Sequence, residues 1–133
     1  MSFKVGDIKT VTVQVTDKMV RQFAEMSGDM NPMHLDDEYA KNTRYGRRIA
    51  HGMIAGALIS RALAMELGHG GIYLSQTLKF LLPVFIDDVL TIQLRVASLR
   101  EGKGIGNIET TVTKQTGELV VKGEALILKG EFV

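Results

Sequence analysis

Hydrophobic and polar positions divide the chain into a helical first half and a strand-rich second half. Residues 16–67 carry apolar side chains at helical spacing, whereas residues 72–129 alternate between apolar and polar side chains, as half-buried strands do. Before the first half, Val11, Val13 and Val15 alternate with polar neighbours and indicate a short strand. Helices followed by consecutive antiparallel strands are typical of the α+β class, not of a parallel α/β sheet.

Three helices are expected in the first half. The first begins after Thr16, a residue type that caps helix N-termini, and stops near Gly28. A short helix is expected over residues 36–42, followed by a basic loop. The longest helical pattern covers residues 51–67, where most of the circumference is apolar or small, so this helix should be buried on most sides. Its apolar stripe contains Ile54, Leu58, Ala62 and Met65, widened by Ala55, Ile59 and Leu63.

Four strands are expected after the long helix. They cover residues 72–83, 89–99, 105–115 and 118–128. The connections at residues 87–88, 101–104 and 116–117 are short enough for hairpins. In the first of these strands, one face should carry Leu74, Leu78, Phe80 and Leu82. This pattern predicts a meander of strands that wraps one buried helix.

Length and composition predict a single domain over residues 1–133. The chain has 133 residues, close to the ~150 residues typical of one domain. Sixteen basic and fifteen acidic residues leave a formal net charge of +1, so we expect no nucleic-acid partner. The absence of cysteine excludes disulfides, iron–sulfur clusters, thiol catalysis and Cys-ligated zinc.

Membrane and export signals are not expected. The first ten residues contain no apolar signal-peptide core, and the most apolar stretch, residues 53–67, is interrupted by Arg61 and Glu66. That stretch is too short and too charged to span a bilayer. We therefore expect a cytoplasmic protein with no membrane partner.

Reactive side chains are densest between Ser27 and Asp36. Asp29 and His34 lie five residues apart, and the intervening Asn-Pro turn can bring both side chains to one point. Histidine titrates near neutrality, and a carboxylate beside it can orient the ring and hold a water, as acid–base catalysis requires. The same residue types are common in ordinary loops, where Asp29 would cap a turn and His34 would lie on the surface.

A second candidate segment, His51-Gly52-Met53, enters the long helix. The first amides of a helix have no internal partner and carry the positive end of the helix dipole. Glycine allows a ligand atom to approach this backbone closely. A thioester carbonyl placed there would have its developing enolate oxygen stabilised by a backbone N–H. In the alternative interpretation, His51 caps the helix and glycine serves packing.

Together these two segments resemble the MaoC-like, or (R)-specific, enoyl-CoA hydratases, which have the hot-dog fold. The shared pattern is S-x-D-x-N-P-x-H-x-D, followed about fifteen residues later by H-G-M. Similarity continues through residues 73–84 and the later strands, so it covers about residues 5–129. One departure is Arg48, where relatives often carry proline. The resemblance implies an antiparallel sheet wrapped around one long central helix.

The resemblance also implies roles for individual residues. The family's catalytic acid corresponds to Asp29, its catalytic histidine to His34, and its oxyanion-hole amide to Gly52. Asn31 corresponds to a residue that holds the loop, and Ser60 to a polar position that faces the site. The further residues assigned to substrate binding are His51, Arg47 and Arg48. Arg44, Arg47 and Arg48 are candidates for contacts with the coenzyme phosphates; the alternative is that they form a solvated loop.

The implied activity is that of a lyase. Water adds reversibly to a trans-2-enoyl-CoA, or to an enoyl-acyl carrier protein, and gives the (3R)-3-hydroxyacyl thioester without metal or cofactor. The family also pairs subunits edge to edge, so a homodimer is expected. Two alternatives stay open: a hot-dog acyl-CoA thioesterase and a non-catalytic module that binds acyl thioesters. The histidine that follows the aspartate, together with H-G-M, favours the hydratase.

Overall fold

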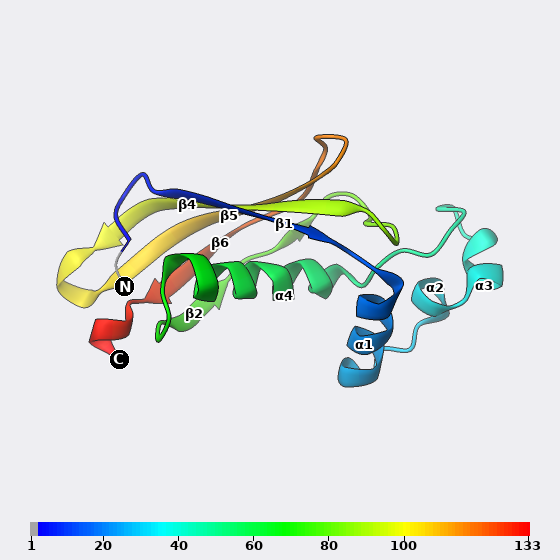
Figure 1. The fold of residues 1–133 in the computed structure, drawn as a ribbon, viewed down its shortest axis with the longest axis horizontal. Helices are drawn as coiled ribbons and strands as arrows, with labels where there is room; N and C mark the ends of the chain where they lie inside the picture. Colours follow the sequence, from blue (N-terminus) through cyan, green and yellow to red (C-terminus); the bar gives the residue numbers. More distant parts are fainter. Residues whose placement is uncertain (1–2) are drawn as a thin grey trace.

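A curved antiparallel sheet wraps around one helix in the computed structural model, which describes residues 3–133 (Figure 1). The strands are β1 (Ile8–Gln14), β2 (Ile72–Gln76), β3 (Lys79–Phe80), β4 (Val89–Arg100), β5 (Ile105–Lys114) and β6 (Leu119–Leu128). The helices are α1 (Asp17–Ser27), α2 (Pro32–Leu35), α3 (Asp37–Lys41) and α4 (Gly52–Ala62). A π-helical turn, Leu63–Leu67, continues α4, and 3-10 turns lie at Glu101–Lys103 and Gly130–Phe132. This is the architecture expected from the sequence.

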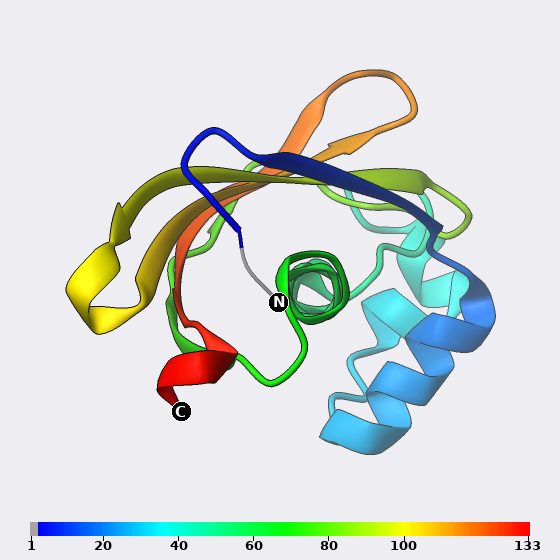
Figure 2. The same cartoon turned by 60° about the vertical axis from the view of Figure 1, so that its left-hand side comes forward.

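The central helix α4 lies within the curve of the sheet, where Figure 2 views it nearly end-on. Its buried face packs against apolar side chains of β4, β5 and β6, which together form the core. The stripe predicted for α4 is buried at Ile54, Leu58 and Ala62 but not at Met65, whose side chain is 58% exposed. The π-turn inserts an extra residue into the last turn. That insertion turns Met65 outward and buries Leu67 instead.

The sheet order is β1-β4-β5-β6-β2, with β3 also paired to β6. Strands β4, β5 and β6 form the predicted meander through the two later hairpins. The hairpin predicted at residues 87–88 is wrong, because β4 pairs with β1 and not with the strand before it. Backbone hydrogen bonds between Val15 and residues 87–88 hold the end of β1 against the start of β4. Strand β1 therefore occupies the position that the preceding segment was expected to take.

The long strand predicted over residues 72–83 is also wrong, because it is broken into β2 and β3. At the break, the carbonyl oxygen of Thr77 approaches so close that a Cβ at residue 123 would overlap it, so only Gly123 fits there. Thr77 exchanges hydrogen bonds with Glu124, through its N–H (2.9 Å) and through its hydroxyl (3.0 Å), in place of the regular ladder. The expected apolar face is largely exposed: Leu74 is 46% and Phe80 52% exposed.

Helices α1, α2 and α3 gather at the N-terminal end of α4 (Figure 1). Helix α1 has the predicted ends: Thr16 accepts a hydrogen bond from the Met19 N–H, and Gly28 closes the helix in the left-handed conformation. The chain then turns through a short loop into α2, which begins at Pro32. This turn places the loop after α1 beside the first turn of α4.

No helix among the described residues is long and apolar enough to cross a membrane.

Candidate active site

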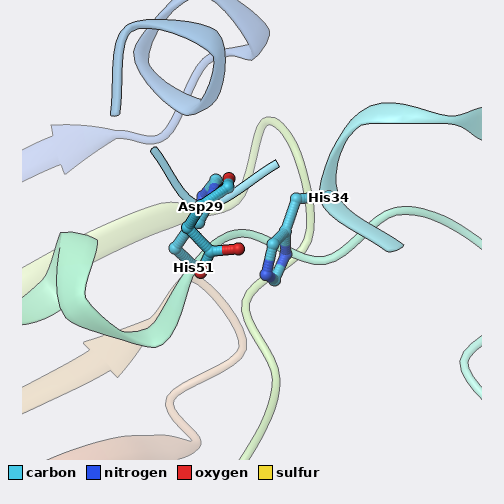
Figure 3. Close-up of side chains that lie close together, drawn as sticks. All are labelled: Asp29, His34 and His51. Atoms are coloured by element: carbon cyan, nitrogen blue, oxygen red, sulfur yellow. The ribbon is translucent and has the colours of Figure 1, made fainter. Parts of the chain in front are cut away.

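Three side chains from separate elements meet where α4 begins (Figure 3). Asp29 follows the end of α1, His34 belongs to α2, and His51 precedes the first residue of α4. One donor atom from each of the three lies within 4.8 Å of the others. The structure thus brings Asp29 and His34 together, as the motif predicts, and adds His51 to them.

His34 is buried, at 7% exposure, and its ring is fixed by a hydrogen bond. Its Nδ1 lies 2.7 Å from the carbonyl oxygen of Ile49. Because a carbonyl only accepts, Nδ1 carries the proton, and Nε2 keeps a free lone pair. This is the tautomer that a general base toward water requires. The interpretation of His34 as a surface residue is therefore wrong.

The pKa of His34 is lowered from its ordinary value of 6.5, principally because burial disfavours the charged ring. The hydrogen bond to Ile49 and the charge of Asp29 act in the opposite direction, and the neighbouring His51 adds to the lowering. The net effect keeps His34 neutral at physiological pH.

The acid side of the pH profile tests this state of His34. A base must be unprotonated to act, and a lowered pKa keeps it unprotonated to lower pH. We expect kcat/KM, which reports the free enzyme, to fall on the acid side only below pH 6.5. Initial rates of the hydration that the sequence resemblance implies, measured across a pH series, give the profile. An acid limb at or above 6.5 would contradict a neutral, buried base.

Local hydrogen bonds hold the Asp29 loop in shape. The Asp29 N–H donates to the hydroxyl of Ser27 (3.1 Å), which itself donates to the carbonyl of Phe23 (2.7 Å). The Asn31 N–H donates to the Asp29 carboxylate (3.2 Å), and the side chain of Asn31 caps α2 by accepting from the Met33 N–H (3.2 Å). Asn31 therefore serves the loop, and the Asp29 carboxylate keeps an exposed side that faces solvent.

A cavity of about 420 Å³ opens beside this cluster and is lined by both His34 and Gly52. Gly52 is the first residue of α4, where backbone N–H groups have no partner within the helix. The far wall is apolar and comes from the segment after β3, with Leu82 and Val84 among its side chains. The cavity can hold a small acyl group with its carbonyl at the α4 N-terminus and its reactive carbons near His34.

The basic loop contributes Arg44 and Tyr45 to the wall of this cavity, and the guanidinium of Arg44 lies 5.1 Å from the ring centre of Tyr45. Arg44 is one of the three arginines of this loop that the sequence makes candidates for the coenzyme phosphates, whereas Tyr45 is not among the predicted binding residues. Arg47 does not line the cavity, since its guanidinium stacks over the ring of Phe85 at 3.9 Å. Ser60 lies in a separate cavity of about 380 Å³ between α4 and β2, together with Tyr73.

The trio of Asp29, His34 and His51 could also be considered as a metal centre. Two of the four ring nitrogens are already bonded to backbone carbonyls, of Ile49 and of Asp29. The remaining nitrogen of His51, Nδ1, is buried and faces no solvent. A metal ion needs ligand atoms directed at one common point, but His51 turns its Nε2 to the Asp29 carbonyl, and its Nδ1 is enclosed by the protein. The arrangement favours proton transfer to and from a water.

Arg48 is held by two carboxylates and does not reach the cavity. Its side chain is 10% exposed and bonds Asp17 of α1 (2.7 Å), Asp37 of α3 (2.9 Å) and the carbonyl of His34 (3.2 Å). The Asp17 pKa is lowered, chiefly by the hydrogen bond to Arg48 and next by the one to Arg21. Arg48 therefore connects α1, α2 and α3, and its contacts are structural.

Removing this ion-pair network should destabilise the protein. Arg48→Met leaves the His34 carbonyl and two carboxylates without their cation, and we expect the free energy of unfolding to fall by about 1–3 kcal/mol. Arg21→Met is the matched control, because Arg21 bonds the same Asp17 at 3.0 Å but is 55% exposed. Its effect should stay below about 0.5 kcal/mol. Urea unfolding measures both, and equal effects would contradict the network.

The sequence matches the family described as MaoC like domain over residues 5–118. An (R)-specific enoyl-CoA hydratase from Aeromonas caviae is 41% identical over 127 residues, which cover 95% of each chain. A mitochondrial 3-hydroxyacyl-[acyl-carrier-protein] dehydratase from Solanum lycopersicum is 35% identical over 132 residues, 98% of this chain and 79% of that one. Among solved structures, an unliganded R-hydratase from Pseudomonas aeruginosa has a TM-score of 0.92 at 43% identity, covering 96% of this chain and 82% of that one.

Proposed function

Because the chain belongs to the MaoC-like domain family, we propose that it is an (R)-specific enoyl-CoA hydratase with the hot-dog fold. It is a hydro-lyase that adds water reversibly to a trans-2-enoyl thioester and gives the (3R)-3-hydroxyacyl thioester. One observation in the structure supports the chemistry most strongly. The buried, neutral ring of His34 has a nitrogen within 4.8 Å of the Asp29 carboxylate, and the same ring lines the cavity that Gly52 borders at the start of α4.

In the proposed mechanism, Asp29 and His34 hold one water between them. Removal of a proton from that water makes it nucleophilic toward C3 of the enoyl group. Negative charge then develops on the thioester oxygen, which accepts a hydrogen bond from the N–H of Gly52. The same pair of side chains returns a proton to C2. All of these groups belong to three neighbouring segments of one chain.

The substrate carrier is proposed to be coenzyme A. Arg44 provides a cation at the wall of the cavity and Tyr45 an aromatic surface beside it, whereas Arg47 and Arg48 are engaged elsewhere. This narrows the predicted phosphate contacts from the arginine cluster to Arg44. The acyl carrier protein named for the tomato relative is the second carrier, and a comparison of kcat/KM for the two crotonyl thioesters distinguishes them.

An assay with crotonyl-CoA tests the function directly. Hydration removes the enoyl absorbance without release of free thiol, whereas a thioesterase releases thiol, and a binding module does neither. Chiral chromatography of the product should show the R alcohol alone. Thiol release, or an S product, would overturn the proposal.

We also propose that the functional form is a homodimer joined at the β2–β3 edge. This sheet edge exposes apolar side chains on consecutive positions, Ile72 to Leu74 and Phe80 to Leu82. Exposed edge strands with apolar side chains invite pairing with another chain. A second copy of the same edge would complete the sheet and cover them. A single hot-dog domain over residues 1–133 and a cytoplasmic location complete the proposal.

Pairing through the β2–β3 edge predicts that a charged residue disrupts the dimer on that edge but not on the opposite edge, β1. Leu74→Asp, on β2, should convert the dimer to a monomer at micromolar concentration, because it places like charges opposite each other across the interface. Ile8→Asp is the matched control on the opposite edge, β1, where Ile8 is 55% exposed. It should leave the mass at twice 14.6 kDa in sedimentation equilibrium. A wild-type protein that is active as a monomer would contradict the proposal.

A further inference from the structure

His51 occupies the capping position of α4 but does not cap it. Its side chain makes no hydrogen bond to the first turn of the helix. The ring turns back, and its Nε2 donates to the carbonyl oxygen of Asp29, 3.0 Å away. The interpretation of His51 as a helix cap is therefore wrong. The bond joins the start of α4 to the residue that carries the candidate catalytic carboxylate.

The ring of His51 also stacks on the ring of His34. The two ring centres are 3.9 Å apart with 29° between the planes, and the ring of Phe23 lies 4.8 Å from that of His51. His51 is 4% exposed, and its Nδ1 is buried without a hydrogen-bond partner. An unpaired lone pair in that place costs less than an unpaired N–H, so the proton belongs on Nε2, where the Asp29 carbonyl accepts it.

Together, these contacts indicate the role of His51 in the site. We propose that His51 is a positioning residue, which fixes the backbone at Asp29 through Nε2 and the ring plane of His34 by stacking. The carboxylate and the free nitrogen of His34 are thereby held toward one water. This proposal rests on the proposed function of the Asp29–His34 pair, and it replaces substrate contact as the role of His51.

The effect of a His51 substitution on the pKa of His34 depends on the charged and titratable groups around the His34 ring. Asp29 faces the ring from the loop after α1, His51 faces it from α4, and the guanidinium of Arg48 bonds the His34 carbonyl. Arg44 and Tyr45 share its cavity. Of the contributions to its pKa, that of His51 lowers it and that of Asp29 raises it. A change at His51 therefore acts on the pKa of His34 in two opposed ways: it removes the lowering by His51, and, where the Asp29 loop is released, it weakens the raising by Asp29.

Two variants separate the contacts of His51. His51→Phe keeps an aromatic ring against His34 but leaves the Asp29 carbonyl without a donor. His51→Gln keeps an N–H that reaches about as far as Nε2 and loses the aromatic ring. We expect kcat to fall on the order of 10- to 100-fold in the phenylalanine variant, with KM changed less than about threefold. The glutamine variant should recover part of kcat. Both variants lose the lowering by His51, but only the phenylalanine variant releases the Asp29 carbonyl, so its acid limb of kcat/KM should lie at lower pH than that of the glutamine variant.

His69→Phe is the matched control, because His69 is an exposed histidine outside the site. It should change neither kcat nor the pH profile. A merely structural role for His51 predicts lower melting temperatures but an unchanged kcat and acid limb in the folded fraction, and that result would overturn the proposal. If the phenylalanine variant does not fold, the glutamine variant is decisive through its kcat: it lacks the ring that stacks on His34, and a folded glutamine variant with wild-type kcat would overturn the proposal.

An NMR titration makes the test independent of the hydratase assay. The chain has three histidines, so the ring resonance of His34 can be followed in wild type and in His51→Gln, with His69 as internal reference. The same titration is followed in His51→Phe, and a lower pKa of His34 in that variant than in His51→Gln, the sign expected when the Asp29 loop is released, supports positioning even if crotonyl-CoA proves not to be the substrate. An unchanged His34 titration together with wild-type kcat would refute it.

Discussion

Replacing Asp29 by asparagine or His34 by asparagine is expected to lower kcat for enoyl-CoA hydration at least ~10²-fold each, the lower range for a positioned acid–base group. Both changes preserve the local structure. In the Asp29→Asn variant, the amide oxygen can still accept from the Asn31 N–H. In the His34→Asn variant, an amide N–H can replace Nδ1 as the donor to the Ile49 carbonyl. What is lost is the carboxylate charge in one variant and the free Nε2 in the other.

The double variant should be far less impaired than the product of the two single effects. Residues that act on one water form a unit, so removing the second member of a broken pair costs little more. Single-turnover rates with crotonyl-CoA, with circular dichroism to show that each variant is folded, give the comparison. His69→Asn serves as the control histidine. Wild-type turnover in either folded single variant would remove that residue from the site.

Substitution of Gly52 by valine is expected to lower kcat on the order of 10²–10³-fold, the range for loss of one oxyanion-hole donor. The backbone amide stays in place, but the branched side chain would crowd the approach of a carbonyl to it. The first atom of that side chain would lie 3.1–3.2 Å from carbons of the Phe80 ring. The Phe80 ring needs to give by only a few tenths of an ångström to accept this atom, so the melting temperature should change much less than kcat.

Arg61→Val is the matched control for Gly52→Val, because it places a β-branched residue on the exposed side of the same helix, outside the cavity. It should reproduce the small loss of helix stability and leave kcat unchanged. Melting temperature and kcat are measured on the same preparations. If glycine at residue 52 serves packing alone, the outcome reverses: the valine variant is unstable, but its folded fraction is fully active.

The sequence by itself determined those features whose causes are local. Thr16 and Gly28 mark the ends of α1 because the capping hydrogen bond and the left-handed turn involve residues within one turn of helix. Alternation predicted β4, β5 and β6 because side chains on a strand point to opposite faces with a period of two. Asp29 and His34 could be paired because they are also close in sequence: five residues and a proline turn separate them.

Only the tertiary structure decided how distant segments meet. Alternation predicts which side chains of a strand face the core, but it does not predict which other strand pairs with it. Nothing in the pattern therefore indicated that β4 pairs with β1. The break between β2 and β3 depends on Gly123, which lies far along the chain from Thr77. Arg48 was read as a substrate contact because a basic loop carries no sign of the carboxylates in α1 and α3 that bind it. Neither the substrate contact predicted for His51 nor the alternative of a helix cap includes its hydrogen bond to Asp29, because the acceptor is a backbone carbonyl, which every residue has and no sequence pattern distinguishes.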